Sequence, residues 1–309
     1  MTDFSRLAGN ATKIAARGYG WTHAGRSQPA LQDIDLVIEP GEKVLLCGDS
    51  GSGKSTLLAA IAGVLGSDEE GTRSGEITLE DSAGTVEEPG RTIPVGLVLQ
   101  DPDSQVISAR VGDDIAFGCE NLAYPREEIW RRVRQAQELV GPYVDLDFPT
   151  EHLSGGQKQR LALAGVIAMG AGVVLLDEPT ANLDPEGAQD VVRAVGKLVE
   201  HTGATLVVVE HQHAAWESVL DRAVELKDGR IISDGPFADV ARKRQVTGLP
   251  QARSLGSDAL EESTAALWSK DLVTRYGPPR SISLPAGAST VITGRNGVGK
   301  STWLMTMAG

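Results

Sequence analysis

Residues 43–56 read KVLLCGDSGSGKST, an apolar stretch that leads into a glycine-rich turn and then into a predicted helix over residues 54–65. The turn matches the pattern G-x-x-x-x-G-K-[ST], and a strand before it with a helix after it is the setting in which this pattern binds phosphate groups. Small residues let backbone N–H groups surround phosphate oxygens, and the helix N-terminus adds partial positive charge. The predicted nucleotide contacts are Gly48, Asp49, Ser50, Gly51, Ser52, Gly53, Lys54, Ser55 and Thr56.

Two residues of this turn have distinct predicted roles. Lys54 would reach the β- and γ-phosphates of a bound ATP, and the Ser55 hydroxyl would ligate Mg²⁺. The alternative is a glycine-rich turn that binds nothing, and the strand-turn-helix setting argues against it.

A second apolar stretch, VVLLDE at residues 173–178, ends in two carboxylates. In a parallel sheet such an end lies near the phosphate loop, because ligands bind at the carboxyl ends of the strands. Asp177 is therefore predicted to hold the magnesium shell, and Glu178 to polarise the water that attacks the γ-phosphate. The alternative is a solvated acidic strand end.

The apolar stretches alternate with helical patterns along residues 31–233. Buried strands are predicted at 43–47, 95–100, 173–176 and 205–209, and helices at 125–141, at 156–169 and after Asp184-Pro185. Alternation of this kind predicts an α/β fold with a mainly parallel sheet that helices cover on both faces. A half-buried strand is also predicted at residues 31–38, and Asp228-Gly229 is typical of a hairpin turn.

The overall composition excludes some classes of function. A formal net charge of −13 argues against a nucleic-acid partner, because phosphate backbones attract an excess of Lys and Arg. The only cysteines, Cys47 and Cys119, have no metal-like or redox spacing, which is typical of a reducing compartment. No apolar run has the length of a signal peptide or of a membrane span.

The chain contains an internal repeat. Residues 41–63 (GEKVLLCGDSGSGKSTLLAAIAG) align without a gap with residues 287–309 (GASTVITGRNGVGKSTWLMTMAG). We therefore expect a complete domain over 1–246, a linker over 247–266 and the N-terminal fragment of a second domain over 267–309, poorly ordered because it is too short to bury its own core. The second phosphate loop is predicted to comprise Gly294, Arg295, Asn296, Gly297, Val298, Gly299, Lys300, Ser301 and Thr302.

One further motif makes the comparison with a known family specific. The sequence LSGGQ resembles the signature of ATP-binding-cassette (ABC) ATPases, and it lies between the phosphate loop and the acidic strand, as in that family. The resemblance implies a P-loop NTPase fold of ABC type, with a mainly parallel core, an antiparallel β subdomain and a helical signature subdomain. It also implies ATP and Mg²⁺ as ligands and pairing with a second cassette. The signature residues are Leu153, Ser154, Gly155, Gly156 and Gln157.

The same resemblance assigns roles outside these motifs. Gln100 resembles the glutamine that senses Mg²⁺ and the transmembrane partner, Asp184 belongs to a D-loop-like segment, and His211 resembles the switch histidine at the γ-phosphate. Trp21 resembles the aromatic residue that stacks on adenine. Tyr19 competes with it for that role, and a core position for Trp21 is the other alternative.

A subfamily is indicated by the segment after Gln100. The sequences DPDSQ (101–105), VGDDIAFG (111–118) and ENL (120–122) resemble the ATPases of energy-coupling-factor importers of vitamins and transition-metal ions. The resemblance implies a peripheral position on the cytoplasmic face of the membrane. It also implies a transmembrane T-type subunit, docked by this segment, and a separate substrate-binding membrane subunit.

Two other functions in this superfamily compete with import. A chromosome or DNA-repair ATPase would carry a long coiled coil between the phosphate loop and the acidic strand, and too few residues separate Lys54 from Asp177 for one. A soluble tandem protein acting on ribosomes would carry basic surface and a long charged linker, whereas this chain is acidic.

Overall fold

The computed structural model of this chain describes residues 11–65, 70–140, 144–181, 183–211, 213–240, 265–273, 280–287, 292 and 300–308. It divides the chain into two units, which we describe separately. The first holds Met1–Leu183 and Gly187–Thr247, and the second holds Gly248–Gly309 together with the short segment Asp184–Glu186.

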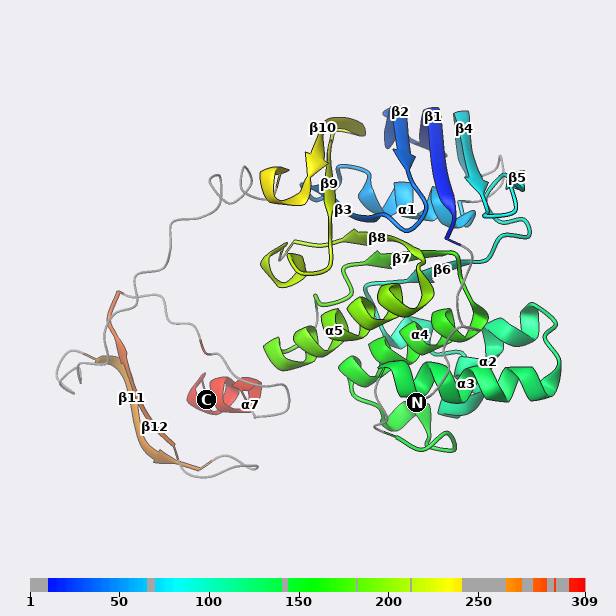
Figure 1. Cartoon of the computed structure of the whole chain (residues 1–309). Coiled ribbons are helices and arrows are strands. Elements are labelled where there is room, and N and C mark those ends of the chain that lie inside the picture. Colours follow the sequence, from blue (N-terminus) through cyan, green and yellow to red (C-terminus); the bar gives the residue numbers. More distant parts are fainter. Residues whose placement is uncertain are drawn as a thin grey trace. The chain divides into compact units, whose positions relative to one another are not determined.

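A six-stranded sheet forms the centre of the first unit (Figure 1). The strand order is β10-β9-β3-β8-β7-β6, and every neighbouring pair is parallel except β9 and β10. All five residues of β8 are buried, which is typical of a strand covered on both faces. The strands are β3 (Lys43–Gly48), β6 (Val95–Val98), β7 (Val173–Asp177), β8 (Thr205–Val209), β9 (Arg222–Lys227) and β10 (Arg230–Pro236).

A four-stranded antiparallel sheet, in the order β2-β1-β4-β5, makes a second layer. Strand β1 was not predicted from the sequence, and it pairs with β2 on one side and with β4 on the other. The strands are β1 (Lys13–His23), β2 (Leu31–Ile38), β4 (Gly71–Glu80) and β5 (Val86–Glu87).

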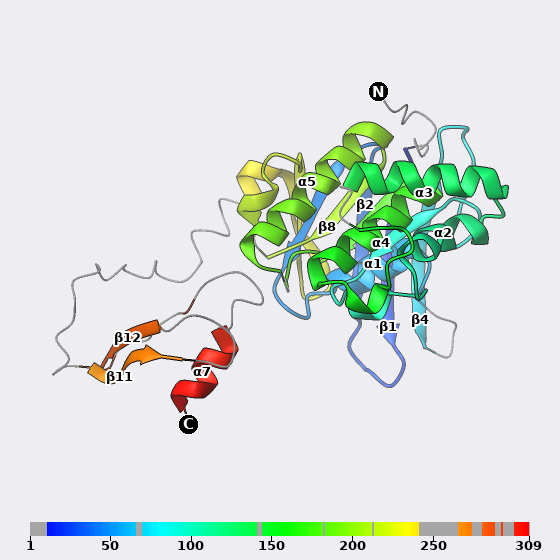
Figure 2. The same cartoon turned by 90° about the horizontal axis from the view of Figure 1, so that it is seen from below.

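Helices cover the two faces of the six-stranded sheet in different ways. Helix α1 (Lys54–Ala62) lies between the two sheets, where Leu57, Leu58 and Ile61 are buried with residues of both (Figure 1). The opposite face is covered by the larger helices, which Figure 2 shows from their own side. They are α2 (Val111–Asn121), α3 (Arg126–Val140), α4 (Gly155–Met169) and α5 (Pro185–Thr202). Short 3₁₀ turns lie at Asp103–Gln105, Thr150–His152 and His213–Trp216.

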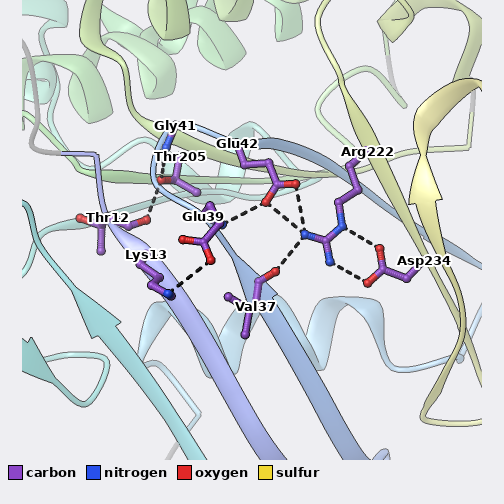
Figure 3. Close-up of polar contacts among 9 residues, drawn as sticks. All are labelled: Thr12, Lys13, Val37, Glu39, Gly41, Glu42, Thr205, Arg222 and Asp234. Carbon is purple, nitrogen blue, oxygen red and sulfur yellow. Dashed lines mark hydrogen bonds and ion pairs between the residues drawn. The ribbon is translucent and has the colours of Figure 1, made fainter.

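Arg222, the first residue of β9, links the six-stranded sheet to the four-stranded sheet (Figure 3). Its guanidinium donates two hydrogen bonds of 2.6 Å to the Asp234 carboxylate on β10, and others to Glu42 (3.1 Å) and to the carbonyl oxygen of Val37 on β2 (2.9 Å). The Asp234 carboxylate, followed by that of Glu42, raises the pKa of Arg222. Arg222 thus fixes the end of β2 against the parallel sheet.

The described part of the second unit contains a two-stranded antiparallel sheet of β11 (Ala265–Leu272) and β12 (Arg280–Pro285), and helix α7 (Lys300–Ala308). Helix α7 begins at the lysine of the second phosphate-loop pattern, as α1 begins at Lys54, and both helices have nine residues. The division into a complete domain, a linker and a second-domain fragment remains a prediction.

The predicted fold class is confirmed: a mainly parallel sheet, an antiparallel layer and a helical region are all present. The predicted helix over 54–65 was too long, because Gly63 adopts the left-handed conformation and its N–H caps the carbonyl oxygens of Ala59 and Ala60. Among the described residues, no helix combines the length and the apolar character that crossing a membrane requires.

Candidate functional site

The phosphate loop runs from the end of β3 into α1, as the sequence predicts. Its backbone follows a course that requires glycine at two positions. Gly53 has a φ of 104°, and a Cβ there would come within 2.5 Å of the carbonyl oxygen of Ala30. Gly48 has a φ of 151°, and a Cβ there would collide with the carbonyl oxygen of Leu226. The small residues therefore fix the loop's shape as well as leaving room for phosphate.

The side chain of Lys54 folds over this loop. Its ammonium nitrogen donates hydrogen bonds to the carbonyl oxygens of Gly48 (3.0 Å) and Asp49 (2.9 Å), and the residue is only 6% exposed. The positive charge is therefore held at the concave side of the loop, where the N-terminus of α1 adds to the positive potential.

Asp177 ends β7, and Ser55 is the second residue of α1. Burial raises the pKa of Asp177, and the neighbouring Glu178 carboxylate raises it further, while the Ser55 hydroxyl and the positive charge of Lys54 oppose this. A hydroxyl and a carboxylate beside a phosphate loop are hard oxygen ligands, so these two residues fit Mg²⁺.

Gln100 and His211 converge on Glu178. The amide nitrogen of Gln100, from the loop after β6, lies 3.0 Å from Oε2, and Nε2 of His211, from the segment after β8, lies 3.0 Å from Oε1. Glu178 itself has a φ of 47°, which turns its side chain out of the line of β7. Three residues far apart in the sequence thus meet at one carboxylate, and the catalytic roles predicted for them remain predictions. Within the described part of the chain, the Gln100 side chain makes no hydrogen bond to Ser55 or Asp177, and its role toward Mg²⁺ remains a prediction.

A cavity of ≈ 480 Å³ extends from the phosphate loop to the end of β1. Its walls combine loop residues with Glu178 and with three residues of the segment 23–30 that were not assigned a role from the sequence. The lining residues are His23, Arg26, Ala30, Ser50, Gly51, Gly53, Lys54, Ser55, Thr56 and Glu178.

Trp21 does not line this cavity, which contradicts its predicted contact with adenine. Its ring is 4% exposed and packs in the core, where it covers Gly71 so closely that any side chain there would collide with it. Tyr19 is buried to the same extent. The position that faces the cavity is His23, whose Nδ1 accepts a hydrogen bond of 3.2 Å from the Trp21 indole nitrogen.

The sequence does contain a signal that favours His23. It is the last residue of β1, two positions beyond Trp21, so both side chains leave the same face of the strand. Trp21 lies on the part of that face that is buried in the core. His23 lies beyond the buried part and lines the cavity. The prediction failed because β1 itself was not recognised.

The signature motif begins α4. Ser154 is the N-cap: its hydroxyl accepts a 3.4 Å bond from the backbone N–H of Gln157, whose side chain accepts a 2.8 Å bond from the backbone of Ser154. Leu153 is buried, whereas Ser154 and Gly155 are exposed and Gly156 is partly exposed. No signature residue lines the cavity described above. The exposed N-terminus of α4 is therefore available to a ligand that is bound outside this cavity.

The segment after Gln100 divides into a packed part and an exposed part. Asp114 is partly buried, and its carboxylate accepts bonds from the backbone N–H groups of Ile107 (2.8 Å) and Ser108 (2.9 Å). Asp113 and Phe117, one helical turn apart on α2, are exposed, and Ile107 is 61% exposed. Asp114 thus shapes the loop, whereas its neighbours form the outer surface.

The hairpin turn between β9 and β10 lies against the phosphate loop. The N–H of Gly229 donates to the carbonyl oxygen of Ser52 (3.1 Å), and the carbonyl oxygen of Gly229 accepts from the N–H of Gln32 on β2 (2.8 Å). Asp228 and Gly229 both have positive φ, 49° and 75°, as this turn requires. One tight turn therefore joins the phosphate loop to the antiparallel sheet.

The remaining predicted positions lie partly outside the described residues. Asp184 directly precedes α5. Of the second phosphate loop, Gly294, Arg295, Asn296, Gly297, Val298 and Gly299 lie outside the described residues, and Lys300, Ser301 and Thr302 are the first residues of α7.

Comparisons with known proteins agree with this geometry. A model of the ABC transporter family matches residues 31–181. The chain is 40% identical over 223 residues to the energy-coupling factor transporter ATP-binding protein EcfA1 of Caldanaerobacter subterraneus, a match that covers 72% of this chain and 78% of that protein. It is 39% identical over 240 residues to a putative ABC transporter ATP-binding protein of Methanosarcina mazei, covering 76% of this chain and 41% of that protein.

Solved structures give the same picture. The cbiO1 protein of Clostridium perfringens, described as part of the ABC transporter complex cbiONQ, superposes with a TM-score of 0.64 at 32% identity, covering 77% of this chain and 93% of cbiO1. The cassette MJ0796, solved as a dimer in a post-hydrolysis state with ADP and Pi, shares the fold, with a TM-score of 0.60 at 24% identity. The chain spans 41% and 45% of the length of two curated Methanosarcina relatives.

Proposed function

This chain belongs to the ABC transporter family of ATPases, and we propose that it is the ATP-hydrolysing subunit of a membrane importer of the energy-coupling-factor type. The observation that carries the proposal is the meeting of Gln100 and His211 at the Glu178 carboxylate beside the phosphate loop. The relatives named as EcfA1 and as part of a cbiONQ complex support the importer type.

Binding of the nucleotide is derived from the loop and the cavity. The loop's N–H groups and the Lys54 ammonium would neutralise the β- and γ-phosphates, and the rest of ATP would extend along the cavity toward His23 and Arg26. We propose that the imidazole of His23 contacts the adenine ring, and that Trp21 holds that imidazole through its indole N–H.

Hydrolysis requires a base that is held in one orientation. Glu178 would accept a proton from the attacking water as that water bonds to the γ-phosphorus, and ADP would depart as the leaving group. The bonds from Gln100 and His211 use one carboxylate oxygen each, and each oxygen keeps a second lone pair for the water. His211 donates to Glu178 when its Nε2 carries the proton, so the pair is oriented for reaction.

Ser55 and Asp177 are the residues that would hold Mg²⁺, which supplies charge neutralisation at the β- and γ-phosphates. Ser55 and Lys54 both lie close enough to Asp177 to lower the pKa of its carboxyl. Ionised Asp177 is disfavoured by burial and by Glu178, and a divalent cation at this position would relieve that cost.

The exposed signature supports a composite site with a second cassette, in the same full-length protein or in a second copy. The Ser154 hydroxyl and the N–H groups of Gly155 and Gly156 open outward from α4, and the cavity at Lys54 is not lined by them. We propose that they contact the γ-phosphate of an ATP held by the other cassette. If a second copy of the chain supplies the other cassette, specific ATPase activity rises with protein concentration, whereas activity constant across a wide dilution series would contradict pairing between copies.

Membrane partners are proposed from the exposed surface at Ile107, Asp113 and Phe117. A T-type transmembrane subunit would place a helix on this surface, a separate membrane subunit would bind the substrate, and the chain would lie on the cytoplasmic face. The substrate class proposed is a vitamin or a transition-metal ion. The ribosomal alternative gains no support from relatives that are named as transporter proteins.

The importer proposal is tested by tagging the chain in cells, extracting with mild detergent and identifying what co-purifies. A multi-span membrane protein that binds the wild type and is lost on Phe117→Arg supports it. Co-sedimentation with ribosomes in a sucrose gradient, with no membrane protein bound, would contradict it.

A further inference from the structure

Glu210 is a buried carboxylate that the proposed chemistry does not use. It follows β8 directly, it is 3% exposed, and it lies one residue before His211. Burying a carboxylate is costly unless hydrogen bonds compensate it, so its contacts indicate what it does.

Its two oxygens bind two different segments of the site. Oε1 accepts hydrogen bonds from the backbone N–H of Thr180 (3.1 Å) and from the Thr180 hydroxyl. Oε2 accepts a bond from the backbone N–H of His211 (3.0 Å). Thr180 belongs to the turn that follows Glu178, and it is itself buried. One side chain therefore holds both the turn after the base and the backbone of the histidine.

The backbones that carry Glu178 and His211 are the ends of two neighbouring parallel strands, where Asp177 pairs with Val209. The N–H of Glu178 donates to the carbonyl oxygen of Val209 (2.9 Å), which is the last ladder bond before the strands end. Beyond that bond, the Glu210 side chain provides the next connection between the two segments. The contacts of Glu210 therefore constrain the two backbone segments from which His211 Nε2 and Glu178 Oε1 approach each other to 3.0 Å.

We propose that Glu210 is a positioning residue for ATP hydrolysis, which acts by holding the His211 backbone and the Thr180 turn so that His211 reaches Glu178. The proposal rests on the roles proposed above for Glu178 and His211. A carboxylate suits the position because all three contacts are donors and a carboxylate only accepts. Glutamine has the same size but one acceptor oxygen, so its amide N–H₂ would face either Thr180 or the His211 N–H, donor against donor.

The test is a double-mutant cycle between Glu210→Gln and His211→Ala, measured as kcat and KM for MgATP, with the unfolding temperature of each variant. We expect Glu210→Gln to lower kcat roughly 10-fold to 100-fold, the scale of a small misplacement at a reacting centre, with little change in KM. In the His211→Ala background the same change should lower kcat less than about twofold, because the residue through which it acts is gone.

Thr180→Val provides a second variant, which removes the hydroxyl and keeps the N–H that Glu210 binds. It should lower kcat less than Glu210→Gln does, because the bond to His211 stays in place. If Glu210→Gln does not fold, the cycle is run between Thr180→Val and His211→Ala with the same criterion. Equal kcat losses with and without His211 would overturn the proposal and leave Glu210 a structural residue.

The two levels of inference fail separately. If Glu178→Gln keeps most of the turnover, the proposed reaction centre itself is wrong. If Glu178→Gln abolishes turnover while the losses from Glu210→Gln and His211→Ala multiply independently, only the positioning role is wrong.

Discussion

Nε2 of His211 lies 3.0 Å from Oε1 of Glu178, although the two residues follow different strands of the central sheet. The parallel pairing of β7 with β8 places the two strand ends next to each other. The left-handed φ of Glu178 then turns its carboxylate toward the histidine. Sheet topology therefore brings together the proposed base for water activation and the histidine proposed to orient it.

Glu178→Gln should lower ATP turnover by about 100-fold to 10,000-fold, the range that a positioned general base contributes. Nucleotide binding should be retained, because the loop and Lys54 are unchanged. Phosphate release and equilibrium ATP binding measure the two effects. Retention of most of the turnover would contradict the assignment of Glu178 as the base.

Lys54→Ala should weaken ATP binding by about 10-fold or more, at least ~1.4 kcal/mol, because it removes the cation on the concave side of the phosphate loop. Calorimetry measures the affinity. The same side chain bonds to the carbonyl oxygens of Gly48 and Asp49, so the unfolding temperature serves as the control. Unchanged affinity in a folded variant would rule out the phosphate role.

His23→Ala and Trp21→Leu form a matched pair on β1. His23→Ala should weaken binding of ATP about fivefold, roughly 1 kcal/mol, and leave binding of inorganic triphosphate unchanged, since only the base contact is lost. Trp21→Leu should cost about 2 kcal/mol or more in the free energy of unfolding, because it opens a cavity in the core. If triphosphate and ATP lose affinity equally in His23→Ala, the histidine does not contact the base.

Asp113→Lys and Asp114→Asn separate docking from folding on α2. Asp113 is exposed, so its reversal should reduce co-purification with the membrane partner and lower the unfolding temperature by only a few degrees, the cost of a positive charge in the first turn of α2. Asp114→Asn replaces one acceptor oxygen with a donor beside the N–H groups of Ile107 and Ser108, and should lower stability by about 1 kcal/mol. Undiminished partner binding by Asp113→Lys would leave this surface without a docking role.

Burial raises the pKa of the Asp114 carboxyl, while the two backbone hydrogen bonds oppose the shift. An acid whose pKa is higher in the folded state binds its proton more tightly there. Asp114 should therefore stabilise the fold most at pH below its ordinary pKa of 3.8, and this contribution should fade as pH rises through the raised value. Comparing the wild type with Asp114→Asn across pH isolates the contribution of Asp114 to the free energy of unfolding. If this free energy depends on acidic pH in the same way in both proteins, the assignment is contradicted.

Arg222→Ala should destabilise the first unit by about 2 kcal/mol, since it removes charge-assisted bonds to Asp234 and Glu42. For a domain of this size that corresponds to a fall of about 4–8 °C in Tm. Lys43→Ala is the control, because Lys43 forms an ion pair with the exposed Asp221. We expect it to lower the free energy of unfolding by about 1 kcal/mol or less. Equal losses of unfolding free energy in the two variants would show that Arg222 does not stabilise the contact between the two sheets.

Local patterns in the sequence were enough to place the phosphate loop and the strand ends of the candidate site. Sequence reasoning failed where the tertiary position of a residue decides its role. The phosphate loop and the strands ending at Asp177 and Val209 could be predicted because glycine spacing and apolar runs are local signals. The role of Trp21 could not, because stacking on a ligand and packing in a core require the same kind of side chain. Only the pairing of β1 with β4, which puts Trp21 over Gly71, separates the two.

The Asp228-Gly229 turn has a practical consequence for labelling this protein. Hairpin turns are usually chosen for inserted tags and dyes because they tolerate added length. This one is hydrogen-bonded on one side to Ser52 of the phosphate loop and on the other to Gln32 of β2. An insertion here would disturb the nucleotide pocket, whereas an environment-sensitive fluorophore attached beside it, at Lys227, would report on nucleotide occupancy.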